Sequence, residues 1–311
     1  MSAWKLAYRS LIFFCILGLF FLPLPENSLW WREAANSGHV IVFLLLSLVI
    51  SSYLGYQARF ATRMQSYAAI ILAGMLIGIG VEFIQYHTGR EASALDLLVN
   101  FLGLISGLCL VEAFRLIGRP KYRRVSFVLV ITSLSLIAVC IMPLMLLSVS
   151  YIERNKAFPV IADFDSHWTA AFTRFNKVSL VAKDEHEPPD GIRRVRFEPT
   201  EYPGISIVEP VSDWTEYDRL VVALYSNNDH MISVTVRIHD VVHNQSHSDR
   251  YNISLAVEPG MNMYKILLKD VEQAPLNRAM DMTAIAGLTL FANSLDKPVT
   301  LGISNIRLVR P

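Results

Sequence analysis

The first half of the chain consists of long apolar stretches separated by short polar segments. A membrane-spanning helix needs about 20 predominantly apolar residues. We therefore expect about five transmembrane helices, formed by Leu6–Leu22, Gly38–Tyr56, Tyr67–Tyr86, Ala94–Phe114 and Val125–Val149. Several aromatic residues lie near the ends of these stretches, where amphipathic rings prefer the membrane interface: Trp30, Trp31, Tyr56, Tyr86 and Tyr151.

Beyond Tyr151 the pattern changes to short segments of alternating polarity. Val234, Val236 and Ile238 alternate with Thr235 and Arg237, which predicts a strand with one solvated face. Similar segments rich in β-branched and aromatic residues end at Pro, Gly, Asn or Asp, without intervening helices. The expected strands are Val178–Lys183, Ile192–Glu198, Gly204–Val208, Arg219–Tyr225, Met231–His239, Arg250–Val257, Met263–Lys269, Gly287–Phe291 and Thr300–Val309. This pattern predicts an all-β sandwich or jelly roll.

The two patterns divide the chain into a transmembrane helical domain, 1–150, and a β domain, 151–311. A hydrophobic fraction of 53% and a mean hydropathy of +0.38 exceed those of an ordinary soluble enzyme. The net charge of +1 indicates no nucleic-acid partner, which would need a concentrated basic face. Cys15, Cys109 and Cys140 all lie in apolar stretches, so the β domain must fold without a disulfide.

Basic residues predict the orientation. One set of segments carries Lys5, Arg9, Arg59, Arg63, Arg115, Arg119, Lys121, Arg123 and Arg124. The opposite loops hold only Arg32 and Arg90. The positive-inside rule makes the first set cytoplasmic, and five spans then place the β domain outside the cytoplasm. The first stretch could instead be a cleaved signal peptide, but its exit, Pro23–Glu26, has no small-residue cleavage site.

Polar residues gather around the outer ends of the second, third and fourth stretches. They are His39, Glu82, Gln85, Arg90, Asp96 and Asn100. A carboxylate at the bilayer centre costs about 2.5–3.5 kcal/mol, so such groups usually face a partner or a water-filled cavity. The alternative is structural: Arg90 and Asp96 would lie among the headgroups, and Gln85 and Asn100 would only hydrogen-bond between helices.

The spacing of these residues predicts that they face one another. Glu82 and Gln85 share one helix face, and Asp96 and Asn100 continue into Gly103 and Gly107 along another. Gly74 with Gly78, and Gly103 with Gly107, form small-xxx-small pairs that let helices approach closely. Arg90, in the turn between the two helices, could bridge Glu82 and Asp96.

The run Glu82-x-x-Gln85, Gly89-Arg90, Ser93-x-x-Asp96-x-x-x-Asn100-x-x-Gly103-x-x-x-Gly107 resembles the signature of the VanZ-like family. His39 resembles that family's earlier motif, although Asn36 and Phe43 replace its usual lysine and aromatic hydroxyl. The resemblance covers roughly residues 1–120. It implies a protein of the bacterial cytoplasmic membrane, in a family whose name-giving member is linked to low-level teicoplanin resistance, and it supplies no reaction.

A histidine and two carboxylates can move protons, and Arg90 suits a phosphate or carboxylate. These groups would fit a lipid-linked phosphate substrate at the outer leaflet. No nucleophile–base pair, metal signature or Gly-rich phosphate loop accompanies them, so we assign no cofactor and no metal. Whether the protein is an enzyme stays open. The alternatives are a non-catalytic, membrane-anchored glycan-binding or scaffolding protein, and a small transporter.

The β domain is similar to carbohydrate-binding modules of the galactose-binding-like jelly-roll class. The similarity rests on Trp214–Leu220, Pro259–Ile266 and Leu301–Ile306 and implies glycan binding through aromatic side chains. The candidate aromatic residues are Trp168, Trp214, Tyr217, Tyr225, Tyr251 and Tyr264, although most aromatic residues of a sandwich belong to its core. The expected partners are therefore a cell-envelope glycan or lipid-linked saccharide and membrane lipid.

Two further groups of side chains have the residue types of metal ligands. Asp163 and Asp165 could hold a structural calcium, although two carboxylates alone are weak evidence. His239, His243 and His247 recur at every fourth residue, which would suit a helix, but they fall at a strand end and a turn. We therefore expect a solvated turn rather than a metal site there.

Overall fold

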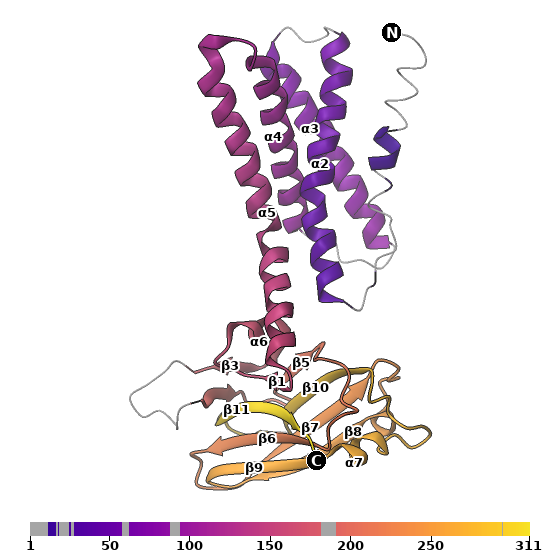
Figure 1. Ribbon diagram of the computed structural model, residues 1–311, viewed down its shortest axis with the longest axis vertical. Coiled ribbons are helices and arrows are strands. Elements are labelled where there is room, and N and C mark those ends of the chain that lie inside the picture. The colour runs from indigo at the N-terminus through magenta and orange to yellow at the C-terminus, as the bar shows by residue number, and fades with distance from the viewer. Residues whose placement is uncertain are drawn as a thin grey trace. The chain divides into compact units, whose positions relative to one another are not determined.

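The computed structural model describes residues 12–16, 18, 25, 28–57, 62–87, 94–181, 191–293 and 295–311. The chain divides into two compact units, Met1–Leu147 and Ser148–Pro311. Figure 1 labels their helices and strands. Each unit is described separately.

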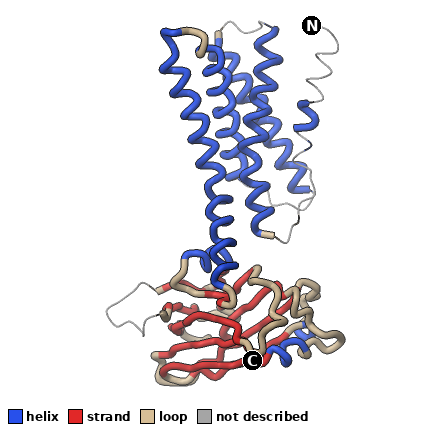
Figure 2. The backbone as a smooth tube through the Cα atoms, viewed as in Figure 1, coloured by secondary structure: helices blue, strands red, loops and turns tan. Residues whose placement is uncertain are grey.

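The first unit is helical. Its elements are α2 (Leu29–Gln57), α3 (Arg63–His87), α4 (Ala94–Leu116), η2 (Pro120–Tyr122) and the start of α5 (Arg123–Ala157). Four helices among the described residues are long and apolar enough to cross a membrane (Figure 2). They correspond to four of the five predicted spans. The other predicted span, Leu6–Leu22, lies mostly outside the described residues.

All four of these helices extend beyond their predicted bounds, α2 and α5 by the most. The second span was expected to begin at Gly38, but α2 begins at Leu29 and includes Arg32 and Glu33. Likewise, α5 continues past Val149 to Ala157. Arg, Glu and Ala all favour helical backbone, and a helix does not have to end where its side chains become polar. Hydropathy therefore located the apolar segments but underestimated the helices.

The glycine pairs predicted to bring helices together do so between α2, α3 and α4. A Cβ atom on Gly103 would lie 2.6 Å from the carbonyl oxygen of Val40, and one on Gly107 would lie 2.6 Å from that of Leu44. On α3, a Cβ atom on Gly74 would meet the side chain of Leu104 at 2.5 Å. Only glycine permits backbones to approach so closely.

The second unit is a two-sheet antiparallel sandwich, as predicted. One sheet has the order β3-β4-β11-β6-β9, with β1 also paired to β11, and the other has the order β2-β5-β10-β7-β8. Its strands are β1 (Val160–Ala162), β2 (Thr173–Asn176), β3 (Val178–Leu180), β4 (Arg193–Phe197), β5 (Gly204–Val208), β6 (Arg219–Ser226), β7 (Ile232–Asp240), β8 (Tyr251–Val257), β9 (Gly260–Leu267), β10 (Ile285–Ala292) and β11 (Val299–Val309).

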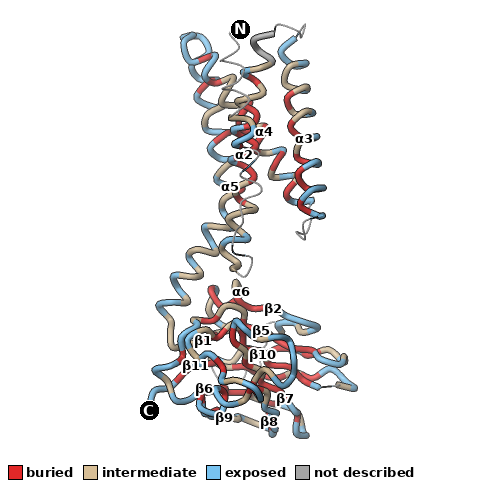
Figure 3. Tube along the Cα trace, turned by 90° about the vertical axis from the view of Figure 1, so that its right-hand side faces the viewer, coloured by how far each residue is buried: buried red, intermediate tan, exposed pale blue. Residues whose placement is uncertain are grey.

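The facing sides of the two sheets form one apolar core. Figure 3 colours the buried stretches of the strands red. On β7, Val234, Val236 and Ile238 are buried in it, and the alternate residues Thr235 and Arg237 point to the other face. The predicted alternation is thus confirmed. It leaves one face of the β2-β5-β10-β7-β8 sheet lined by polar side chains.

The expectation of strands without intervening helices is wrong in detail. Helices α6 (His167–Phe172) and α7 (Leu268–Glu272) and the 3-10 turn η3 (His247–Asp249) lie between strands. Lys269, predicted to end a strand, belongs to α7 because β9 is shifted to Gly260–Leu267. The short strands β1 and β2 were not predicted. Both have only three or four residues, too few for a period-two pattern to be distinctive.

Candidate functional site

Polar side chains are buried between the helices of the first unit. The side chains of His39, Glu82, Gln85, Asp96 and Asn100 are all buried, with Asn100 at 0% exposure. Nδ1 of His39 and Oδ1 of Asn100 are 2.9 Å apart, so a hydrogen bond joins α2 to α4. Because an amide oxygen only accepts, this bond assigns a proton to Nδ1 of the imidazole.

Helix α3 also reaches this cluster. A Cβ atom on Gly78 would lie 3.1 Å from Nδ2 of Asn100, so the backbone of α3 packs against the Asn100 amide. Glu82 and Gln85 are buried one and two turns further along the same helix. The structure thus brings His39 and Asn100 together and buries the other described members of the predicted site. Arg90, the remaining member, lies outside the described residues.

A second polar cluster, which was not predicted, lies where α3 begins and α4 ends. Glu112 forms an ion pair with Arg63 at 2.9 Å and accepts a hydrogen bond from the hydroxyl of Tyr67. Arg115 lies 3.7 Å from the same carboxylate. The contacts of Glu112 with Arg63 and Tyr67 join α4 to α3, and each pair is at least 45 positions apart in the sequence. No local sequence pattern could therefore have predicted them.

In the second unit, the polar face of the β2-β5-β10-β7-β8 sheet contains a groove with a volume of about 800 Å³. We define the groove by its lining residues: Asn176, Tyr202, Gly204, Ser206, Thr235, Arg237, His247, Arg250, Asn252, Ser254, Thr289, Phe291 and Asn293. Ligand sites in proteins typically enclose about 300–1,000 Å³, so the groove has room for a small molecule or a few linked rings.

Strand register arranges the lining side chains in two rows across the sheet. One row runs through Asn176, Gly204, Phe291, Thr235 and Ser254. The next runs through Ser206, Thr289, Arg237 and Asn252. Directly opposed residues on neighbouring strands point to the same side, so each row presents its hydroxyl, amide and guanidinium groups together.

The lining side chains hold one another in place. The hydroxyls of Ser206 and Thr289 are 3.0 Å apart, and the amide of Asn293 donates to the hydroxyl of Thr235 at 3.3 Å. The guanidinium of Arg237 lies 4.7 Å from the ring centre of Phe291 and donates to Oδ1 of Asn252 at 3.3 Å. These contacts keep the polar face ordered.

Two aromatic rings line the groove. The rings of Tyr202 and Phe291 meet edge to face with their centres 6.0 Å apart, and Tyr202 is 54% exposed. Gly204 permits this packing, because a Cβ atom there would lie 2.6 Å from Cβ of Phe291 and 2.7 Å from the carbonyl oxygen of Leu290. An exposed ring beside hydroxyl and amide groups is the combination that can hold a sugar: an apolar face for stacking and partners for its hydroxyls.

The aromatic residues singled out from the sequence lie elsewhere. Trp168, Trp214 and Tyr251 are buried, and all of them contribute to packing within the sandwich. The half-buried rings of Tyr217 and Tyr264 pack against the same core, and Tyr225 is also half-buried. None of the six is among the residues that line the groove. The sequence analysis missed Tyr202 and Phe291, since no local pattern marks which rings reach the polar face.

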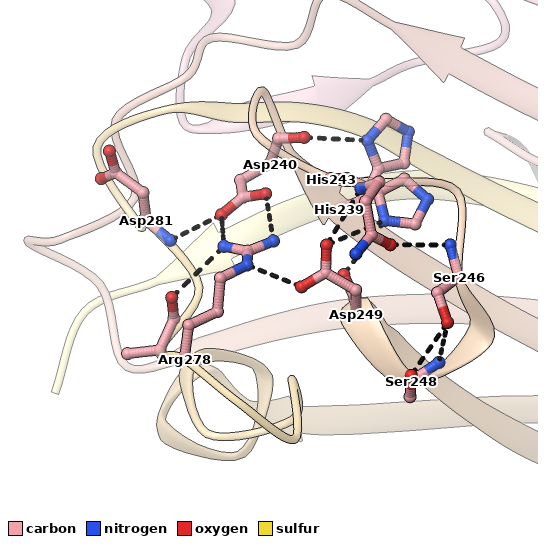
Figure 4. A network of polar contacts seen from close by, with 10 residues as sticks. His239, Asp240, His243, Ser246, Ser248, Asp249, Arg278 and Asp281 are labelled. Atoms are coloured by element: carbon pink, nitrogen blue, oxygen red, sulfur yellow. Dashed lines mark hydrogen bonds and ion pairs between the residues drawn. The ribbon is translucent and has the colours of Figure 1, made fainter.

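Residues 244–248 of the predicted solvated turn are exposed, as expected, but the neighbouring His243 side chain is buried beside a network around Arg278 (Figure 4). Arg278 donates to both carboxylate oxygens of Asp240, at 2.5 and 2.8 Å, and to Asp249 at 2.6 Å. His243, expected in solvent, has a side chain only 3% exposed, and its Nδ1 lies 3.0 Å from the carbonyl oxygen of Asp249. The network closes the turn between β7 and β8 over that ring.

The charges of this network have shifted pKa values. Burial raises the pKa of Asp240, but hydrogen bonds from Arg278 and from the Asp281 amide outweigh it and bring the pKa below its ordinary value. The hydrogen bond from Arg278 likewise lowers the pKa of Asp249. His239, whose ring centre is 5.1 Å from that of His243, has its pKa lowered by burial.

Neither predicted group of metal-ligand types forms a ligand cluster among the described residues. The Asp163 carboxylate accepts hydrogen bonds from the Asp165 amide at 3.1 Å and the Ser166 hydroxyl at 2.6 Å, and so orders the turn that leads into α6. His247 lines the groove, separately from the facing rings of His239 and His243.

No protein-family model and no curated protein matches the chain. The resemblance of residues 1–120 to the VanZ-like family and the link to glycopeptide resistance therefore stay predictions.

Several solved structures are similar to the chain. A family 11 carbohydrate-binding module from Clostridium thermocellum, in complex with a mixed-linked tetrasaccharide, is 14% identical, with a TM-score of 0.36, covering 48% of this chain and 94% of that chain. A family 30 module of a C. thermocellum cellulase is 13% identical, with a TM-score of 0.31, covering 43% and 82%. An exo-β-agarase is 16% identical, with a TM-score of 0.37, and the matched region covers 49% of this chain but only 25% of the agarase. In all three cases the matched region covers less than half of this chain.

Proposed function

We propose that the protein is a membrane-anchored glycan-binding protein whose groove holds a saccharide of the cell envelope. The observation that carries the proposal is the groove itself, where an exposed Tyr202 ring lies beside two ordered rows of hydroxyl and amide side chains. Four helices of membrane-spanning length in the same chain would keep such a site at a membrane surface.

The orientation in this proposal follows from charge. Basic residues concentrate in alternate loops, so the N-terminus would be cytoplasmic and the sandwich periplasmic or extracellular. Reporter fusions to the C-terminus, active only outside the cytoplasm, test this directly. A C-terminus inside the cell would remove envelope glycans as ligands.

The binding test uses the full-length protein in a detergent without a sugar headgroup, applied to a glycan array. We expect binding to one class of saccharide and a loss of about tenfold in affinity for Tyr202→Ala, because the stacking ring is removed. Met263→Ala is the matched control, since Met263 is 58% exposed but on the other sheet. Failure of a folded protein to bind any saccharide, or equal losses for both variants, would refute the proposal.

A second candidate function rests on the cluster between α2, α3 and α4. Glu82 on α3 and Asp96 on α4 are buried, and the His39–Asn100 hydrogen bond joins α2 to α4. Buried ionisable groups in membrane helices favour acid–base chemistry on a lipid-linked substrate, with Arg90 as a predicted contributor. Glu82→Gln and Asp96→Asn should then abolish complementation of a deletion strain while the proteins still insert. If both variants complemented the deletion fully, the helices would serve only as a membrane anchor. Loss of solute flux across vesicles, with glycans unaltered, would instead indicate a transporter.

A further inference from the structure

The groove carries positive charge without compensating negative charge. Arg237 and Arg250 both line it, and none of the described residues that line it is acidic. Elsewhere in the sandwich, described arginines such as Arg196, Arg278 and Arg310 form ion pairs with carboxylates. The arginines of the groove therefore differ from these because no carboxylate lies among the residues that line the groove with them.

The contacts of the two groove arginines are with neutral groups. Arg237 donates to the amide oxygen of Asn252 and lies over the ring of Phe291. The Nε atom of Arg250 is buried and has no hydrogen-bond partner among the described residues. No ion pair in the described part of the chain includes either side chain. A buried donor without an acceptor is costly, and a charged one more so.

The electrostatics of the groove agree with this geometry. Burial lowers the pKa of Arg237, and the nearby positive charge of Arg250 lowers it further. Burial also lowers the pKa of Arg250. Guanidinium groups nevertheless remain protonated in proteins, so the groove keeps both charges and their mutual repulsion. An anion between them would relieve that repulsion and accept hydrogen bonds from both.

We infer that the saccharide of the groove is anionic, with a carboxylate or sulfate substituent bound by Arg237 and Arg250. This inference rests on the proposed glycan-binding function and specifies its ligand class. Planar guanidinium groups match the oxygen geometry of both substituents. The Tyr202 ring would stack on the sugar, and the neutral rows of Ser, Thr and Asn side chains would bind its hydroxyls.

The test compares three oligosaccharides on the full-length protein in a detergent without a sugar headgroup. They are an oligouronide, the same oligomer with its carboxyl groups reduced to hydroxymethyl, and a sulfated oligogalactan. We expect the oligouronide or the sulfated oligomer to bind at least about tenfold more tightly than the reduced one, with an advantage that declines as salt is added.

Variants assign the effect to the groove. Arg250→Gln should lose about tenfold in affinity for the anionic oligomer and leave the reduced one within about twofold. Arg307→Gln, on the exposed face of the other sheet, is the charge-matched control and should change neither. The salt dependence of the unmodified protein requires no variant and still tests the inference if Arg250→Gln fails to fold.

The outcomes separate the two proposals. Equal binding of the reduced and charged oligomers would overturn the anionic assignment and leave glycan binding intact. Absence of binding to all three, together with no binding on the wider array, would overturn both. An anionic preference that survives Arg250→Gln and Arg237→Gln would also overturn the assignment, because the charge would then be recognised elsewhere.

Discussion

Asn100 and Ser106 are fully buried between helices, whereas Leu72 and Phe83 on α3 are mostly exposed. In the sandwich, Trp214 and Val236 are fully buried, and polar side chains cover the groove face. The helical unit therefore buries polar as well as apolar side chains and exposes apolar ones, whereas the core of the sandwich is apolar. Lipid is as apolar as leucine, so helices gain little by burying leucine and more by pairing polar groups and packing small residues. In water the gain comes from burying apolar area.

The largest effect should come from filling the contact between α2 and α4. Gly107→Ala places a methyl group 2.6 Å from the carbonyl oxygen of Leu44 and even closer to the Ser47 hydroxyl, which should destabilise the helical unit by about 3 kcal/mol. Denaturation in detergent measures this. Gly80→Ala is the control, because nothing lies within 4 Å of the added atom. Equal stability of the two variants would show that close backbone contact does not hold the helices.

Asp240→Asn should lower the free energy of unfolding of the sandwich by a similar amount. The carboxylate of Asp240 is fully buried, and its removal leaves Arg278 without its bidentate partner, at a cost of about 3 kcal/mol. Hydrogen exchange of β7 peptides during urea unfolding reports on this unit alone. Glu216→Gln breaks the exposed pair with Arg310 and should cost less than about 1 kcal/mol. If Asp240→Asn had only a small effect, apolar contacts rather than the ion pair would stabilise this turn.

The His39–Asn100 hydrogen bond should contribute less. A double-mutant cycle with His39→Ala and Asn100→Ala should give a coupling energy of about 1 kcal/mol or less, typical of hydrogen bonds between membrane helices. Denaturation of the four proteins in the same detergent provides the measurement. Additive effects, with no coupling, would argue that the two side chains do not interact.

The smallest expected effect is a change in the stability of the sandwich between pH 7 and pH 5. Burial lowers the pKa of His239, so the unfolded chain takes up its proton first as the pH falls below about 6.5, and stability decreases. Asp240 and Asp249, with lowered pKa values, keep their contribution until the pH falls below about 4. Hydrogen exchange of β7 and β8, corrected for intrinsic rates, should show this order. This prediction would be contradicted if the sandwich became more stable on mild acidification. It would also be contradicted if the slope of stability against pH were the same in His239→Gln as in the unmodified protein.

Local sequence pattern was enough to predict the architecture. Four of the predicted spans and most strands lie where hydropathy and alternation indicated, because a chain in lipid or water must bury the matching face of each element. The glycine pairs were also readable, since only small residues at helical spacing allow close contact. The ends of the helices and the short helices α6 and α7 were not predictable in this way, because backbone propensity and tertiary packing determine where such elements begin and end.

The groove and the Arg278 network were decided by tertiary structure. Gly204 and Phe291 are 87 positions apart in the sequence but are neighbours across β5 and β10. Asp240 and Arg278 are separated by 38 positions, and only folding closes the turn that joins them. Alternation along a strand tells which residues share a face, whereas the order of strands decides which faces combine. For that reason the sequence predicted a polar sheet face but not the tyrosine, phenylalanine and arginines that meet on it.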